Sequence, residues 1–220
     1  MPSGMSYFVK KVNWSPKMFQ LGSHDLIEQE LEVLGRLRNS SVMIPLAYTL
    51  TTRNAHLFYE FTEKGTLFDV LHRSLGTCIM LKSLNEAQIG DIELSKVIDP
   101  SKSIRNLSVV VGSVGYVPPE YAYTMRVTMA GNVYSFGVIL LELLTGKTAV
   151  SEGSELAKWV ESKEKHNFDQ ILDSTVSWAS QAVRDQMLAV LKVVLACVSV
   201  SPEARPDMMS VLHMLHNARN

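Results

Sequence analysis

The chain has 220 residues, of which 46% are hydrophobic and 20% are charged, and its formal net charge is −1. This composition is typical of a globular protein with one large domain or two small ones and a sizeable core. The balanced charge gives no electrostatic reason to expect nucleic acid or an anionic membrane as a partner. Two cysteines, Cys78 and Cys197, cannot build a disulfide framework and indicate a reduced compartment.

The first sixty residues alternate like strands around one helix. Residues 6–12, 42–50 and 56–61 are rich in β-branched and aromatic side chains and predict three strands. Residues 24–37 predict a helix, because apolar residues recur there at the spacing of one helical face (Ile27, Leu31 and Leu34).

Beyond residue 65 the pattern is mainly helical. A short helix is predicted at 66–72, and short strands at 79–81 and 87–92. Residues 131–146 are apolar on nearly every side and predict a buried central helix that ends at Gly146. Three more helices are predicted, over 153–165, 180–198 and 207–218. We therefore expect an α+β protein with a small strand-rich lobe, residues 1–62, and a larger helical lobe, residues 63–220.

No transmembrane segment is expected within this sequence. Its most apolar segments, 133–144 and 187–200, are too short to span a bilayer and carry Glu142 and Lys192. The first eleven residues lack the long apolar core of a signal peptide.

Lys10 and Glu30 are a candidate functional pair. Lys10 ends the strand pattern YFVK, and Glu30 lies on the inward side of the predicted helix, where an acid is costly without a partner. An ammonium group paired with this carboxylate would be placed to meet phosphate oxygens. Taken alone, a solvated lysine and a solvated glutamate explain the pattern better, since both residue types are almost never fully buried.

Three motifs in the second half of the sequence favour the functional interpretation of Lys10 and Glu30. GSVGYVPPEY (112–121), AGNVYSFGVILLELLTGK (130–147) and CVSVSPEARP (197–206) occur in this order. Together they closely resemble the protein kinase fold, and more narrowly the intracellular kinase domain of plant leucine-rich-repeat receptor-like serine/threonine kinases. The resemblance covers nearly the whole chain, and the ordered set is far more specific than any single motif. It implies a truncated two-lobed kinase fold, with ATP and Mg²⁺ as the cofactors of the family.

The resemblance assigns roles in the N-terminal lobe. Lys10 would be the phosphate-facing lysine, and Glu30 its partner on the regulatory helix. Tyr59 would be the gatekeeper, and Glu60 and Thr62 would offer hinge backbone groups to adenine.

It also assigns roles further along the chain. Asp91, in a DIE where the family usually has DFG, would be the metal-binding aspartate. Glu120 would close the activation segment and pair with Arg205. Four serines of that segment would be possible phosphoacceptors: Ser101, Ser103, Ser108 and Ser113.

The sequence departs from a working kinase in two places. A glycine-rich loop should precede the lysine strand, but the nine residues before Lys10 contain one glycine, Gly4. Gly65 and Asp91 are 26 positions apart, and that interval would have to hold a hinge helix, a helix crossing the lobe, the catalytic loop and two strands. A crossing helix alone takes about 20 residues. The long helix before the catalytic loop is therefore predicted to be deleted, near residues 72–79.

The fragment LHRSLGTCIML (71–81) has two interpretations. Laid on the catalytic-loop pattern H-R-D-L-x-x-x-N, it places Ser74 at the base and Ile79 at the metal-binding asparagine. A serine hydroxyl cannot accept the substrate proton as a carboxylate does, and isoleucine offers no oxygen to a hard cation. Alternatively, LHRS ends the hinge helix and the chain continues directly into the strand IML. Either interpretation loses the catalytic base.

Two further positions differ from the family pattern. Asn132 stands where an aspartate usually anchors the catalytic loop, although asparagine could still cap the central helix. Gly90-Asp91-Ile92-Glu93 lacks the glycine that follows the metal aspartate in the family. We therefore expect any metal site at Asp91 to be weak, and ATP to bind weakly or not at all.

The leading interpretation is a catalytically deficient kinase-like module of a plant receptor kinase, cytoplasmic or at the cytoplasmic side of the plasma membrane. It would act through contacts with other receptor kinases or signalling proteins. Two alternatives stay open: an active serine/threonine kinase whose missing segments belong to a longer chain, and a non-functional splice or gene-model fragment. Loss of the crossing helix should also leave part of the central helix uncovered, which would permit self-association through an apolar face.

Overall fold

The computed structural model describes residues 6–13, 28–29, 31–32, 35–36, 39–51, 54–62, 65–72, 79–83, 86–90, 114–124, 126, 128–151, 153–164, 168–177 and 179–219. The chain forms two compact units, Met1–Arg105 and Asn106–Asn220. The boundary between lobes that the sequence predicts lies at 62/63 instead. That boundary rests on family resemblance rather than on compactness, and it stays a prediction.

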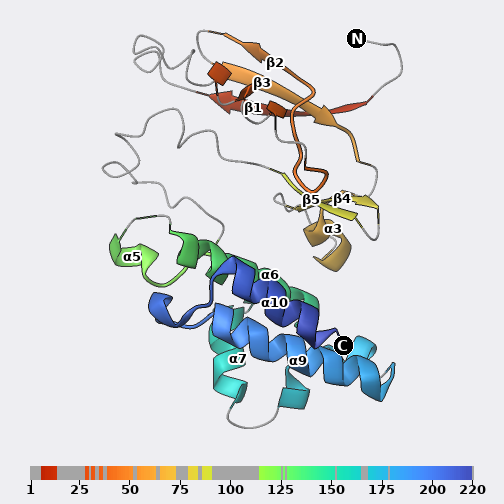
Figure 1. Ribbon diagram of the computed structural model, residues 1–220, viewed down its shortest axis with the longest axis vertical. Coiled ribbons are helices and arrows are strands. Elements are labelled where there is room, and N and C mark those ends of the chain that lie inside the picture. The colour runs from red at the N-terminus through yellow and green to blue at the C-terminus, as the bar shows by residue number, and fades with distance from the viewer. Residues whose placement is uncertain are drawn as a thin grey trace. The chain divides into compact units, whose positions relative to one another are not determined.

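The first unit is built on a three-stranded antiparallel sheet (Figure 1). Its strands are β1 (Tyr7–Asn13), β2 (Ala47–Leu50) and β3 (Asn54–Glu60), in the order β1-β3-β2. Alternate residues of β3 are buried, as expected for a strand with one face on a core. The core of this unit comprises Leu31, Met43, Ala55, Leu57 and Tyr59.

Two expectations for this unit are refined by the structure. Residues 28–29, 31–32 and 35–36 are helical, within the helix predicted at 24–37, whereas Ile27 and Leu34 lie outside the described residues. The strand predicted at 42–50 was too long, because β2 begins only at Ala47. Pro45 explains the shortening, since proline cannot donate a hydrogen bond to a neighbouring strand.

A helix and a hairpin complete the described part of the first unit. Helix α3 (Leu67–His72) is followed by β4 (Ile79–Ser83) and β5 (Glu86–Ile89), which pair antiparallel. The hairpin is bound on two sides: the Ile89 amide donates to the Ser41 carbonyl at 2.7 Å, and the Leu81 amide donates to the Gly65 carbonyl at 3.0 Å. It therefore belongs to the same unit as the sheet.

A reciprocal cap starts α3. The Thr66 amide donates to Oδ2 of Asp69 at 2.8 Å, and the Asp69 amide donates to Oγ1 of Thr66 at 3.0 Å. These two bonds satisfy donors that the first turn of a helix leaves without partners. Gly65, with φ of 70°, provides the left-handed turn that leads into this cap.

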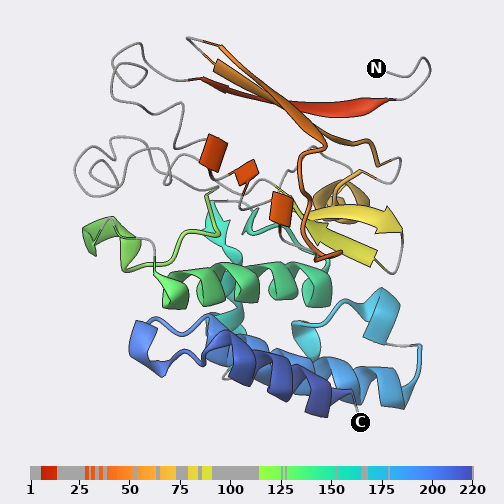
Figure 2. The same ribbon diagram turned by 45° about the horizontal axis from the view of Figure 1, so that its top comes forward.

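The second unit is a bundle of helices, seen from two directions in Figures 1 and 2. Its longer helices are α6 (Met129–Thr145), α7 (Leu156–Glu164), α9 (Gln181–Cys197) and α10 (Met208–Ala218). The shorter elements are α5 (Tyr121–Thr124), the hairpin β6 (Val150–Ser151) and β7 (Ser154–Glu155), α8 (Ser174–Ser177), and the 3₁₀ turns Phe168–Gln170 and Pro202–Ala204.

Sequence signals set the ends of these helices. Thr128 caps α6 by accepting a bond from the Gly131 amide, and Asp207 caps α10 by accepting one from the Ser210 amide. Gly146 ends α6 in the left-handed region, with φ of 66°, as predicted for this helix. The expectation that Asn132 could cap α6 was wrong, because α6 begins three residues earlier, at Met129, and Asn132 lies in its first turn.

Helix α6 is the centre of this unit. Val138 and Leu141 are fully buried, and they pack with residues of α7 and α9 in the main core. Gly137 allows α9 to approach closely, since a Cβ atom there would lie 2.8 Å from Cβ of Cys197. A smaller cluster joins α6, α9 and α10 through Val133, Val193, Cys197 and Val211.

Candidate functional site

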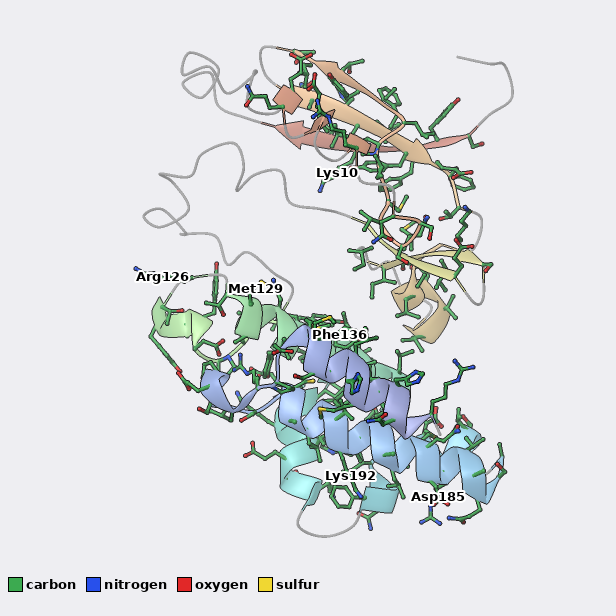
Figure 3. All side chains as sticks on the ribbon, viewed as in Figure 1. Lys10, Arg126, Met129, Phe136, Asp185 and Lys192 are labelled. Carbon is green, nitrogen blue, oxygen red and sulfur yellow. The ribbon has the colours of Figure 1, made fainter. Side chains whose placement is uncertain are left out.

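Lys10 lies in the middle of β1, directly opposite Leu57 of β3. Its side chain is half-buried and takes part in an interaction within the structure. Glu30, its expected partner, lies outside the described residues, so the pair remains a prediction. Figure 3 shows Lys10 on the sheet of the first unit.

The expected hinge follows the end of β3. Tyr59 is buried, its ring centroid lies 6.2 Å from that of Phe8, and burial raises the pKa of its phenol. Glu60 ends the strand and is exposed. Thr62 is half-buried, and its Oγ1 is buried without a hydrogen-bond partner among the described residues. Such an orphaned polar atom marks a place where a ligand or solvent group would be favoured.

The two interpretations of LHRSLGTCIML can be compared with the elements around it. His72 is the last residue of α3, and Ile79 is the first residue of β4, paired with Ile89. These positions agree with a chain that leaves the hinge helix and continues into a strand. Ser74 and Asp91 lie outside the described residues, as do Ser101, Ser103, Ser108 and Ser113.

Glu120 and Arg205 form a buried, bidentate ion pair in the second unit. Nη1 and Nη2 of Arg205 donate to Oε1 and Oε2 of Glu120, each at 2.7 Å. The side chain of Glu120 is 6% exposed and that of Arg205 is 0% exposed. The bonds from Arg205 hold the pKa of the Glu120 carboxyl below its ordinary value, against the opposing effect of burial. This contact joins residues that the sequence resemblance had paired.

The guanidinium of Arg205 has further partners. It donates to the carbonyls of Ser199 at 2.8 Å and Ala130 at 3.0 Å. Its Cζ lies 5.0 Å from the centroid of the Tyr134 ring, a cation–π distance. Burial raises the pKa of Tyr134 to about 12, so this ring stays neutral. One side chain therefore ties the segment around Glu120 to the start of α6 and to the loop before α10.

A second anchor holds the segment before Glu120, and sequence reasoning missed it. The Tyr116 hydroxyl donates to Oε2 of Glu142 at 2.7 Å, and Ser135 Oγ donates to the Tyr116 carbonyl at 2.8 Å. Glu142 is buried, and its Oε1 accepts the Ala149 amide at 2.8 Å. The sequence did indicate that Glu142 needs hydrogen-bond partners, because it is the one charged residue of the apolar helix 129–145 and a buried charge without partners is costly.

The described residues fit ATP and Mg²⁺ only in part. Lys10 and the hinge residues are placed in one unit, but the expected metal ligand, Asp91, lies outside the described residues. Within the part of the chain that the structure describes, no group of three or more His, Cys, Asp or Glu residues could hold a metal ion. Among those residues there is also no helix with the length and apolar character needed to cross a membrane.

Comparison with known proteins shows which class of protein domain this chain contains. Residues 76–216, more than half of the chain, match the model of the protein kinase domain. The chain is also similar to the solved structure of the pseudokinase domain of BIR2, described as an immune regulator of the RLK/Pelle family. That likeness has a TM-score of 0.75 and 23% sequence identity, and it covers 99% of this chain and 76% of the other.

Curated relatives of the chain include receptor-like kinases of plants. The chain is 35% identical over 262 residues to the leucine-rich repeat receptor-like tyrosine-protein kinase PXC3 of Arabidopsis thaliana, covering 100% of this chain and 29% of PXC3. It is 31% identical over 236 residues to the leucine-rich repeat receptor-like protein kinase TDR of the same plant, covering 86% of this chain and 22% of TDR. The chain therefore belongs to the protein kinase domain family, and within that family it is similar to the kinase parts of leucine-rich repeat receptor-like protein kinases. It spans less than a third of the length of these two relatives.

Proposed function

We propose that this chain is a catalytically deficient kinase-like domain that acts through protein contacts in receptor signalling, at the cytoplasmic side of the membrane. The observation that carries the proposal is the short connection between α3 and β4. His72 ends α3 and Ile79 begins β4, so six residues, 73–78, join them. A helix crossing the lobe needs about 20 residues, and the catalytic loop needs more.

The total length of the alignment with PXC3 leaves room for such a deletion. It runs over 262 positions, whereas the chain has 220 residues, so about 42 positions of the relative have no counterpart here. Phosphoryl transfer depends on positioning and on metal electrostatics. A chain without the base and the metal-binding asparagine lacks the groups that supply both.

Ordered contacts in the second unit support a role in protein binding. Two buried hydrogen bonds of 2.7 Å join Glu120 to Arg205, which also donates to the Ala130 carbonyl of α6. A part-buried hydrogen bond of 2.7 Å joins Tyr116 to Glu142 of α6. These contacts do not depend on the residues that a kinase uses for chemistry. A domain that has lost catalysis can therefore keep an ordered surface for partners.

A phosphotransfer assay tests the proposal. The purified chain is incubated with Mg-ATP labelled at the γ-phosphate, alone and with a generic acceptor protein, and the label on both proteins is measured. We expect no incorporation above that of a Lys10→Met control. Incorporation by the parent chain that disappears in a folded Lys10→Met variant would contradict the proposal and favour an active kinase.

Transcript sequencing across the codons of residues 73–78 distinguishes the remaining interpretations. A transcript that is continuous there in the source tissue is the expected result. A longer transcript with an additional coding segment at this point would instead identify the chain as a fragment of a complete kinase.

A further inference from the structure

Phe8 shares one face of the three-stranded sheet with Lys10, which Figure 3 labels. Both residues belong to β1, where side chains two positions apart point to the same face and lie about 7 Å apart along the strand. Phe8 is directly opposite Tyr59 of β3, and Lys10 is directly opposite Leu57. Residues that face one another in an antiparallel pair project to the same side of the sheet. We call this surface the Lys10 face: Phe8, Lys10, Leu57 and Tyr59.

The register places Phe8 between Lys10 and the expected hinge. Because β1 and β3 are antiparallel, the step from Lys10 back to Phe8 runs towards the end of β3 at Glu60. The next pair along the two strands is Tyr7 with Glu60, where the expected hinge begins. A nucleotide that met Lys10 with its phosphates and the hinge backbone with its base would therefore have to cross the position of Phe8.

The ring of Phe8 is held by an aromatic contact but is not covered. Its centroid lies 6.2 Å from that of the Tyr59 ring, and the two ring planes are tilted by 50°, within the range of attractive aromatic pairs. Phe8 is 46% exposed, whereas Tyr59 is 7% exposed and Leu57 is 1% exposed. Side chains of a strand stand roughly perpendicular to the sheet. The Phe8 ring therefore stands at the margin of the core and takes up room between Lys10 and the hinge.

We propose that Phe8 blocks the nucleobase position on the Lys10 face, so that this chain excludes ATP by steric hindrance. A purine that entered would have to displace the Phe8 ring from Tyr59 or stay away from the hinge backbone. The first outcome loses the aromatic pair, and the second loses the hydrogen bonds of the base, so each weakens nucleotide binding. Phe8 is thus a specificity-determining residue of the site around Lys10.

This inference deepens the proposed catalytic deficiency and rests on it, because both assume a nucleotide site built around Lys10. The short connection 73–78 accounts for the loss of chemistry, whereas Phe8 accounts for the loss of base binding. The two effects are separable by experiment: a variant without the ring should bind ATP and still transfer no phosphate.

Isothermal titration calorimetry of the full chain with Mg-ATP tests the block. Phe8→Ala should bind Mg-ATP about tenfold or more tightly than the parent chain, the gain expected when a ring-sized apolar surface of the ligand is buried. Magnesium triphosphate, which has no base, is the second probe. It should bind the parent chain and Phe8→Ala equally, because Lys10 is unchanged.

Val9→Ala is the matched control. Val9 follows Phe8 on β1 and is also 46% exposed, but its side chain points to the opposite face of the sheet. This change should leave ATP binding at the level of the parent chain. Phe8→Val is a second variant that removes the ring, and it keeps a residue of high strand propensity in case Phe8→Ala destabilises β1. Urea midpoints measured on each variant confirm that the fold is retained.

The proposal fails if the parent chain binds Mg-ATP as tightly as folded Phe8→Ala and Phe8→Val, including the case in which none of the three binds. Tighter binding by the parent chain than by Phe8→Ala would also overturn it, since the ring would then stack on the base instead of excluding it. An equal gain in Val9→Ala would assign the effect to a loosened strand and would overturn it too. Phosphotransfer by Phe8→Ala would uphold the block and refute only the catalytic deficiency.

Discussion

Replacing Arg205 by methionine should destabilise the second unit severely. The change removes two bonds of 2.7 Å to Glu120 and leaves that carboxylate, 6% exposed, without its cationic partner. It also removes the donor to the carbonyls of Ser199 and Ala130. Removing one member of a buried ion pair costs about 3–5 kcal/mol, because the other charge stays buried and uncompensated. Against a domain stability of about 5–15 kcal/mol, this is a large fraction of the margin.

Urea denaturation measures this loss. A Trp14→Phe, Trp178→Phe background leaves Trp159, which packs against the main core of the second unit, as the single fluorescent reporter. We expect Arg205→Met to lower the urea midpoint strongly with little change in slope. Lys158→Met is the control: it removes an exposed pair with Glu155, 3.2 Å apart, and should cost less than about 1 kcal/mol.

A double-mutant cycle separates the ion pair from the other contacts of Arg205. Glu120→Gln and Arg205→Met together should cost clearly less than the sum of the single changes, since each single change leaves one buried charge alone. Additive effects within about 0.5 kcal/mol would refute the reasoning, and so would a cost below about 1 kcal/mol for Arg205→Met.

Two more predictions follow from the same contacts. The pKa of Glu120 in the folded chain lies below its ordinary value of 4.5, so the stability that this carboxylate contributes is complete above pH 4.5 and is lost as the pH falls through the folded-state pKa. The free energy of unfolding should therefore fall less steeply with decreasing pH in Glu120→Gln than in the parent chain. Urea midpoints between pH 6 and acid unfolding measure this difference. Gly137→Val should push α6 and α9 apart, since even a Cβ atom at this position would lie 2.8 Å from atoms of Cys197 and Val198. The free energy of unfolding should fall by about 1–3 kcal/mol or more. An unchanged melting temperature would contradict the tight packing of these helices.

Much of the second unit could be predicted from the sequence because its signals are local. The apolar run at 131–146 ends at Gly146, and the observed helix ends there too. Asp207 caps α10 at the place where the sequence shows a proline followed by an acid. Glu120 and Arg205 are 85 positions apart, so their pairing could be predicted only from the family resemblance. The buried bidentate contact between them confirms the pairing.

The remaining features depend on tertiary contacts. Strand propensity alone predicted a strand over 42–50, but β2 begins only at Ala47. The backbone of a strand must pair with a neighbour, and Pro45 cannot donate a hydrogen bond to one. No residue pattern identified Tyr116 as the partner of Glu142, since the two meet only when the segment 114–121 folds back onto α6. The apolar sequence of α6 likewise gave no indication of which side stays uncovered. That was decided by the helices that pack around it, which bury Val138 and Leu141 and leave Leu143 exposed.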